Sequence, residues 1–279
     1  MKLEKLDPAF QDYLWGGTKL RDVYGKRCDF DKVAESWELS THPAGESTLA
    51  GGEREGLPLG QYFQQFPEVV GKNARAFRDF PVLIKLIDAK EPLSIQVHPS
   101  DEYALRVEGE YGKTEMWVIV DCDPGAFLYF GVNRPVSKEE FRQRIENNTV
   151  LEVLNKVEVH PGDVFFIQSG TIHAIGAGIL ICEIQQNSNV TYRVYDYGRV
   201  GKDGKKRELH IEKAVAVTNC APAKKDDSHY PHIADCDYFT VDKLNLDGTT
   251  FNKLEGTVSE KSFLSILVLD GEGTITSNG

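Results

Sequence analysis

The chain has 279 residues, of which 41% are hydrophobic and 27% are charged, so it can bury a substantial core as a globular protein. A formal net charge of −11 argues against nucleic-acid or anionic-membrane partners, and no apolar run reaches the roughly 18 residues of a membrane span. Five cysteines without a CxxC spacing, and no apolar core for a secretory signal near Met1, predict a cytoplasmic protein with free thiols.

Short runs rich in β-branched and aromatic residues recur along the chain, separated by turns rich in glycine and proline. Such runs predict short strands, and closely spaced strands with few helices between them are typical of a β-barrel or a β-sandwich. The clearest runs cover residues 82–89, 93–98, 116–122, 126–132, 163–168, 178–185 and 191–197.

A few helices are expected to interrupt the strands. They are predicted at residues 57–67, 72–77 and 101–108, and directly after Ser137. For the third helix, Ser100 is the expected N-cap and Gly109 the stop. Ser137 and Glu140 form a capping box, which strengthens the prediction of the last helix.

A polar, proline-flanked stretch at residues 221–231 predicts a linker between two domains. Residues 1–222 are expected to form the larger domain, and residues 223–279 a smaller β module at the C-terminus. Strand-like runs at 238–246 and 263–275 support this module. Because the second run stops so close to Gly279, the module is expected to be incomplete.

Polar and apolar side chains alternate along residues 93–98. In an extended strand, Ser94, Gln96 and His98 face one side, and their apolar neighbours face the other. One interpretation is a strand with its polar face in water. On the inner face of a barrel, the same groups would instead need hydrogen bonds or a metal ion.

A glutamate and a second histidine extend this pattern. Glu115 shares a strand face with Lys113, so a simple ion pair is one interpretation; His173 follows a glycine turn, where a hydrogen-bonded core histidine is the alternative. Taken together, two imidazoles, one carboxylate and one amide oxygen suit a divalent ion such as Zn²⁺ and leave positions open for water or substrate. This predicted ligand set is Gln96, His98, Glu115 and His173.

Two arginines follow in a strand rich in tyrosine. Arg193 and Arg199 fall on one face of this run, where an inward arginine suits an anion or an oxyanion. An ion pair with Glu183 or Asp196 is the alternative. No helical HExxH, GxGxxG, P-loop or GxSxG motif is present, which disfavours zincin proteases, dinucleotide enzymes, P-loop ATPases and α/β-hydrolases. The cations expected to serve a phosphate are Lys85, Lys113, Arg193 and Arg199.

Several segments resemble the short bacterial branch of the type I phosphomannose isomerases. They are LWGGTKL, PVLIKLIDAKEPLSIQVHPSDEYA, GKTEMW and GTIHAIGAGILICEIQQNSNVTYRVYDYGR, and the run from Gly162 to His173 resembles the second cupin motif. The resemblance covers about residues 8–220. It implies a mainly β fold, a cupin (jelly-roll) barrel with a few helical insertions and the second, smaller β module at the C-terminus.

The resemblance also implies roles for individual residues. It implies one Zn²⁺, or another divalent ion, per chain on the four ligands named above. It makes Arg193 the catalytic arginine, and it places Ser94 and Arg199 against the phosphate of the substrate. Lys113 and Glu183 match positions associated with proton transfer, and the general base stays open between these two side chains and a metal-bound water.

The implied reaction interconverts mannose 6-phosphate and fructose 6-phosphate through a cis-enediol. The expected partner is a small sugar phosphate, with no nucleic acid and no membrane, and the expected assembly is a monomer or a homodimer. Two other functions stay open: a cupin dioxygenase that uses Fe²⁺, and a cupin that binds sugar phosphates without converting them. Broader aldose isomerisation, without a strict need for a phosphate, also stays open.

Overall fold

A computed structural model describes most of the chain, namely residues 3–201, 204–224, 230–249 and 252–277. The chain forms two compact units. The first comprises Met1–Ala9, Trp37–Ile84 and Asp227–Gly279, and the second comprises Phe10–Ser36 and Lys85–Asp226. Every candidate site residue named above lies in the second unit. The domain boundary expected after residue 222 stays a prediction, and the two units follow a different division of the chain.

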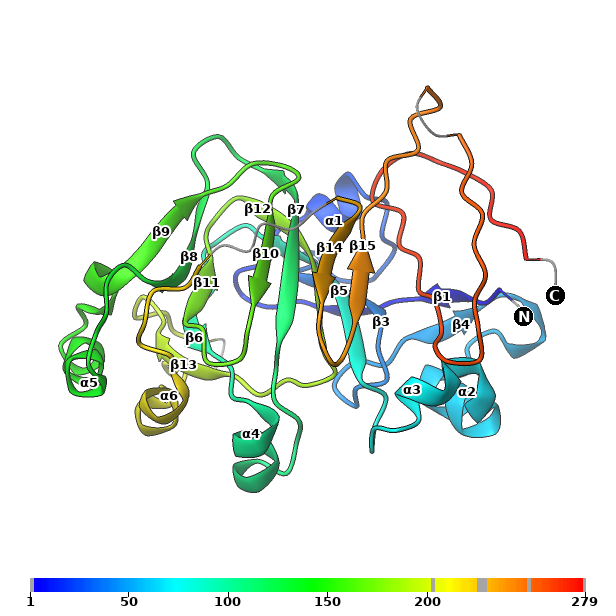
Figure 1. The fold of residues 1–279 in the computed structure, drawn as a ribbon. Coiled ribbons are helices and arrows are strands. Elements are labelled where there is room, and N and C mark those ends of the chain that lie inside the picture. The colour runs from blue at the N-terminus through cyan, green and yellow to red at the C-terminus, as the bar shows by residue number, and fades with distance from the viewer. Residues whose placement is uncertain (1–2, 202–203, 225–229, 250–251, 278–279) are drawn as a thin grey trace. The chain divides into compact units, whose positions relative to one another are not determined.

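Two sheets dominate the structure (Figure 1). The six-stranded sheet has the order β10 (Val164–Ile167), β7 (Glu115–Cys122), β12 (Ile179–Gln186), β5 (Val82–Ala89), β3 (Glu35–Leu39) and β2 (Ala9–Gln11). The five-stranded sheet has the order β13 (Tyr192–Tyr195), β6 (Ile95–Val97), β11 (His173–Ile175), β8 (Phe127–Val132) and β9 (Leu154–Glu158). Strands were predicted in all seven clear runs between residues 82 and 197, and the structure confirms each of them.

The core of the second unit has two parts. One cluster takes apolar side chains from strands of both sheets, among them Trp117 of β7 and Phe130 of β8. The other joins the five-stranded sheet to helices, and there Ile95 and Val97 pack with Phe141. The apolar face predicted for residues 93–98 is therefore buried. Its polar face is not in water either, because Ser94 and His98 are 2% and 1% exposed.

The helices are short. They are α1 (Lys19–Asp22), α2 (Leu59–Gln65), α3 (Gly71–Ala74), α4 (Asp101–Val107), α5 (Lys138–Glu146) and α6 (Ile211–Val217), with 3₁₀ turns at Gly52–Arg54, Pro67–Val70 and Val150–Val153. Ser137 is the N-cap of α5 as predicted, because its hydroxyl accepts a 3.0 Å hydrogen bond from the Glu140 N–H. The carboxylate of Glu140, the other member of the predicted capping box, accepts from Arg134. Helices α1 and α6 were not predicted from the sequence. Within the described residues, no helix is long and apolar enough to cross a bilayer.

The first unit contains two small antiparallel sheets. One pairs β1 (Lys5–Asp7) with β4 (Thr48–Ala50), and the other pairs β14 (His232–Asp235) with β15 (Thr240–Asp242). Of the predicted linker, residues 225–229 lie outside the described part of the chain.

The strands predicted at residues 263–275 are wrong, because this segment holds no helix or strand. Its apolar side chains do alternate, but Leu264, Ile266 and Val268 are 64%, 54% and 60% exposed. A strand needs a partner for its backbone hydrogen bonds and a surface for its apolar face, and sequence alternation reports neither.

Candidate metal centre and active site

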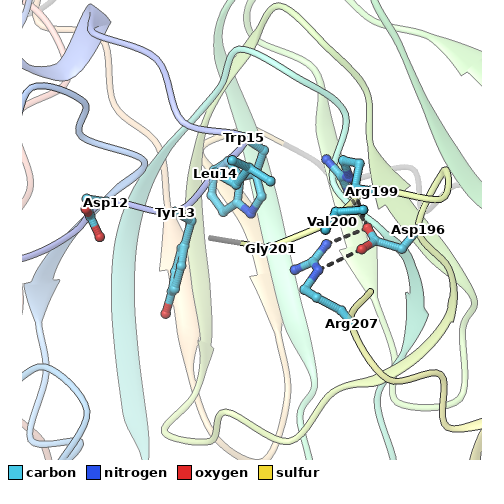
Figure 2. Close-up of a pocket in the computed structure, with 9 residues that line it drawn as sticks. All are labelled: Asp12, Tyr13, Leu14, Trp15, Asp196, Arg199, Val200, Gly201 and Arg207. Carbon is cyan, nitrogen blue, oxygen red and sulfur yellow. Dashed lines mark hydrogen bonds and ion pairs between the residues drawn. The ribbon is translucent and has the colours of Figure 1, made fainter. Parts of the chain in front are cut away.

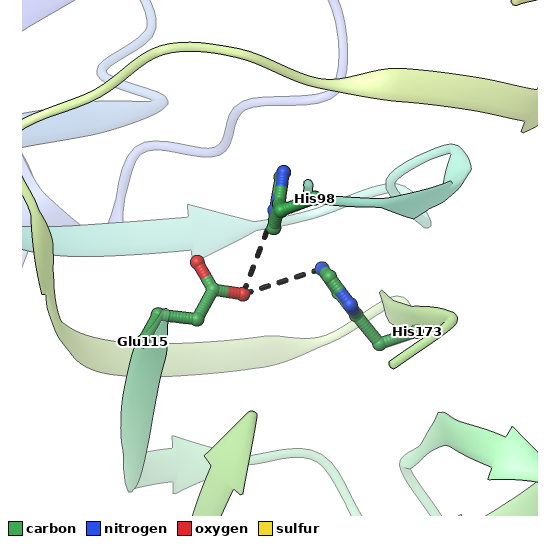
Figure 3. A group of neighbouring side chains, drawn as sticks. All are labelled: His98, Glu115 and His173. Atoms are coloured by element: carbon green, nitrogen blue, oxygen red, sulfur yellow. Dashed lines mark ion pairs between the residues drawn. The ribbon is translucent and has the colours of Figure 1, made fainter. Parts of the chain in front are cut away.

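Two imidazoles and a carboxylate meet inside the second unit (Figure 3). His98 follows β6, Glu115 begins β7, and His173 begins β11. One ligand atom from each residue lies within 4.8 Å of the other two, and all three side chains are buried. Oε1 of Glu115 is 3.2 Å from Nε2 of His173 and 3.7 Å from Nε2 of His98. The structure thus brings together three of the four predicted ligands.

Gln96, the fourth predicted ligand, lies directly beside this cluster. It pairs with His173 in the register of β6 and β11. Its Oε1 accepts a 3.3 Å hydrogen bond from the Ser94 hydroxyl. The side chain is therefore close in the sheet, but its oxygen already has a donor.

A glycine turn brings His173 to His98. Gly170 has a φ of +85°, which glycine adopts easily and other residues avoid. A Cβ atom at this position would lie 2.9 Å from the carbonyl oxygen of Val217. The turn lets the Gly170 N–H donate to the carbonyl of His98 at 2.7 Å, so the segments that carry the two imidazoles are tied together.

Backbone carbonyls orient both imidazoles. Nδ1 of His98 lies 2.8 Å from the Val190 carbonyl oxygen, and Nδ1 of His173 lies 2.8 Å from that of Thr171. Since a carbonyl only accepts, each Nδ1 carries the hydrogen and each Nε2 presents a lone pair to the cluster. Burial lowers the pKa of His173 to about 4, and it lowers the pKa of His98 well below the usual range. Both rings are therefore neutral at pH 7.

This arrangement fits a cation. Oε1 of Glu115 and Nε2 of His173 are both buried, and neither has a hydrogen-bond partner within the described structure. Two acceptors held 3.2 Å apart repel each other unless a proton or a cation lies between them. Two neutral imidazole nitrogens and a carboxylate are ligands that divalent zinc accepts, with a further position left open. The hydrogen-bonded Nδ1 atoms are the usual support of such ligands.

Four further charged groups continue the cluster through the sheet. Lys113 Nζ lies 2.5 Å from Glu115 Oε2, 3.4 Å from His98 Nε2 and 3.5 Å from Glu183 Oε1. Lys85 Nζ lies 3.7 Å from Glu183 Oε1 and 3.4 Å from Glu35 Oε2. The ion pair of Glu115 with Lys113, raised as an alternative, is thus present beside the imidazoles.

The two central carboxylates differ in pKa. Burial raises the pKa of Glu115 to about 8, and repulsion from Glu183 adds to this. Burial also acts to raise the pKa of Glu183, but Lys113, Lys85 and the Trp117 N–H, which donates at 2.8 Å, together lower it to about 2. Glu183 is therefore ionised at neutral pH, whereas Glu115 takes up either a proton or a cation. Carboxylates with such different pKa values are typical of catalytic sites.

Arg193 and Ser94 lie next to each other. Nε of Arg193 donates to the Ser94 hydroxyl at 3.2 Å, and Nη1 donates to the Glu208 carbonyl at 3.2 Å. Arg193 also pairs with Gln96 in the register of β13 and β6. Ser94 therefore lies between the guanidinium of Arg193 and the amide of Gln96 and is hydrogen-bonded to both.

Arg199 belongs to a separate group of charges. Its guanidinium pairs with Asp196, which was raised as an alternative, and it lines a cavity of about 270 Å³ together with Arg207 (Figure 2). Arg207 was not predicted as a site residue, because in the sequence it ends a KKR run that is typical of a solvated charged loop. Glu35, which is far from Lys85 in sequence, was not predicted either.

Comparisons with known proteins agree with the resemblance seen in the sequence. Residues 3–117 match a family model described as the type I phosphomannose isomerase catalytic domain. Mannose-6-phosphate isomerase ManA of Bacillus subtilis is 40% identical over 280 residues, which cover 97% of this chain and 86% of the relative. Mannose-6-phosphate isomerase of Streptococcus mutans is 39% identical over 271 residues, which cover 94% of this chain and 83% of the relative.

The fold comparison agrees as well. The crystal structure of mannose 6-phosphate isomerase from Bacillus subtilis aligns with a TM-score of 0.77 at 38% identity, and the match covers 85% of this chain and 78% of that chain. The predicted mainly β, cupin-type fold is confirmed by this match. Because relatives of this identity align over most of their own length, the chain belongs to the type I phosphomannose isomerase family.

Proposed function

We propose that this chain is a metal-dependent aldose–ketose isomerase that interconverts mannose 6-phosphate and fructose 6-phosphate through a cis-enediol. Membership of the family and the names of its relatives support the reaction. The single observation that carries the proposal is the meeting of His98, Glu115 and His173, with unpaired acceptor atoms facing one another at 3.2 Å. The cytoplasmic location and the monomeric or homodimeric state expected from the sequence are part of the same proposal.

The proposed metal is one Zn²⁺, or another divalent ion, per chain. Nε2 of His98, Nε2 of His173 and the carboxylate of Glu115 would hold it, and Gln96 is the candidate fourth ligand. When bound, the ion would act as a Lewis acid that polarises the oxygens of the substrate. It would also take the place of the proton that the raised pKa of Glu115 favours on this carboxylate.

The two neighbouring side chains suit different parts of the proton transfer. Glu183 is ionised at neutral pH and can accept a proton from the substrate carbon. For Lys113, burial acts against the charged form, but Glu115 and Glu183 outweigh it and raise the pKa, so this side chain stays an ammonium. An ammonium cannot act as a base, but it stabilises the negative charge that develops on an enediolate. We therefore assign the base to Glu183 and charge stabilisation to Lys113.

Arg193 is the proposed catalytic arginine. Its guanidinium is held from two sides, by the Ser94 hydroxyl and by the Glu208 carbonyl, so it is oriented before a substrate arrives. A preoriented cation stabilises an enediolate more than a mobile one, because it does not need to reorganise during the reaction. Ser94 and Arg199 are the proposed contacts of the phosphate.

A coupled assay tests the proposal. Purified protein is expected to convert mannose 6-phosphate to fructose 6-phosphate, to lose this activity on chelation, and to regain it when Zn²⁺ is added. Exclusion of oxygen should leave the rate unchanged, whereas a dioxygenase would stop. A sugar-phosphate sensor would bind fructose 6-phosphate in a calorimeter without turnover. Full turnover by protein in which elemental analysis finds no metal would refute the metal-dependent scheme.

A further inference from the structure

Two arginines share one buried carboxylate at the cavity of Figure 2. Asp196 is 6% exposed. Nε and Nη2 of Arg207 donate to its two oxygens at 2.7 and 2.5 Å. Nε of Arg199 donates to Oδ1 at 3.1 Å, and Nη2 of the same arginine contacts this oxygen too.

One arginine would be enough to neutralise Asp196. The second leaves these three side chains with one positive charge in excess, and the carboxylate of Asp12 lines the cavity on the side opposite the arginines (Figure 2). Within the described residues, every side-chain hydrogen bond of Arg207 goes to Asp196, so its Nη1 is left available to a ligand. The side chain of Arg207 is 36% exposed, which lets a small anion reach it.

The backbone that carries this group adopts an uncommon conformation. Tyr197 and Gly198 have φ values of +56° and +70°, and the Arg199 N–H donates to the Asp196 carbonyl at 3.0 Å, which together define a type I′ turn. A tyrosine in the left-handed region is unusual, and such strained residues cluster at functional sites. The turn folds Arg199 back over the Tyr197 ring, with Cζ 5.3 Å from the ring centroid, and onto Asp196.

The cavity also has an aromatic wall. Tyr13 and Trp15 line it together with the two arginines, and their rings are 5.6 Å apart. A volume of about 270 Å³ suits a small molecule rather than a polymer. A charged end and an aromatic wall together fit a phosphorylated sugar, whose anion pairs with guanidinium groups while its ring packs on aromatic faces.

The cavity is joined to the proposed catalytic arginine through the chain. Arg193 precedes Asp196 by three residues, and its Nη1 donates to the carbonyl of Glu208, the residue next to Arg207. This hydrogen bond ties the guanidinium of Arg193 to the backbone beside Arg207.

We propose that Arg207 is a second phosphate-binding residue beside Arg199, that Asp196 is the positioning residue that holds both, and that this pair makes the enzyme selective for phosphorylated over free sugars. The inference deepens the proposed isomerase function and rests on it. The bidentate geometry of guanidinium on phosphate provides the selectivity, since a free sugar offers no such anion.

Kinetics of Arg207→Gln test the proposal. We expect KM for mannose 6-phosphate to rise about tenfold to a hundredfold, as for the loss of one charge-assisted pair, with kcat little changed. Turnover of free mannose, measured as kcat/KM, should stay the same. Arg207→Lys should recover part of the lost affinity, because lysine restores the positive charge but cannot form the two parallel hydrogen bonds of a guanidinium. Arg142→Gln is the matched control, since Arg142 also grips a carboxylate, that of Glu212, through both Nη atoms.

Asp196→Asn tests the positioning role. It should raise KM for mannose 6-phosphate in the same way, yet leave both the metal content and the turnover of free mannose unchanged. If Asp196→Asn lowers the turnover of mannose and of mannose 6-phosphate in the same proportion, then Asp196 has only a structural role. That result would overturn the proposal.

A binding measurement separates this inference from the isomerase proposal. Inorganic phosphate and fructose 6-phosphate are titrated calorimetrically into wild-type protein and Arg207→Gln, with no turnover required. Weaker binding by the variant supports the subsite even if the chain proves not to isomerise its ligand. Equal binding by both proteins refutes the subsite even if the isomerase activity is present.

Discussion

Replacing Glu115 with glutamine should make the metal-free protein more stable. Burial raises the pKa of this carboxyl from 4.5 to about 8, so the folded protein holds a proton at pH 7 that the unfolded chain has released. At pH 7 the solution is about 2.5 pH units above the pKa of the unfolded chain, and each unit costs about 1.4 kcal/mol. Protonation of Glu115 therefore lowers the free energy of unfolding of the wild type by about 3 kcal/mol. Glutamine is neutral without this cost. Its amide can also donate to the unpaired Nε2 of His173.

The pH dependence of this difference has a defined sign. When folding raises the pKa of a carboxyl group, the group destabilises the folded state only above the pKa that it has in the unfolded chain. The loss of stability grows as the pH rises toward the pKa in the folded protein. The two proteins should therefore be equally stable below about pH 4.5. The advantage of Glu115→Gln should grow by about 1.4 kcal/mol per pH unit and level off near 5 kcal/mol above about pH 8.

Urea unfolding of chelated protein at pH 5, 7 and 8.5, followed by tryptophan fluorescence, measures this difference. Glu158→Gln is the control, because the side chain of Glu158 is 65% exposed and its replacement should change the stability by less than about 0.5 kcal/mol. With Zn²⁺ in excess the order should reverse, because only the wild type gains binding energy. A metal-free variant that is less stable than the wild type at pH 8.5 would refute the reasoning.

Two further predictions concern single contacts. Arg193→Ala should keep its bound metal but lose about a hundredfold or more in kcat, as for removal of one oxyanion donor; elemental analysis and the coupled assay check this, and loss of metal together with activity would contradict it. Ser137→Ala should lower the free energy of unfolding by about 1 kcal/mol, because the N–H of Glu140 loses its acceptor at 3.0 Å. An unchanged urea midpoint would show that the cap contributes nothing.

Local signals in the sequence predicted the strands and the polar face of the site. The predicted strand at residues 82–89 is β5 with the same limits, and all eight of its residues are buried. Alternation along residues 93–98 placed Ser94 and His98 on one buried face. The run at 263–275 shows the same kind of alternation but formed no strand. Alternation describes one face of a segment, and it does not reveal whether another strand lies beside it.

Contacts between distant segments were beyond local signals. The sequence named Lys85 and Glu183 as candidates, but it did not predict that Lys85 lies between Glu183 and Glu35. In the sequence, Arg207 is part of a basic run that is typical of a solvated loop, although its guanidinium forms an ion pair with the buried carboxylate of Asp196. Such pairings depend on the register of strands and on loop conformation, and neither can be read from one sequence.

A crystal structure of the zinc-loaded protein with anomalous scattering data tests the central claim most directly. We predict one strong peak about 2.0–2.2 Å from Nε2 of His98, Nε2 of His173 and a carboxylate oxygen of Glu115, and the same map shows whether Gln96 joins them. A fully active protein whose zinc lies elsewhere, with these three groups unligated, would contradict the account.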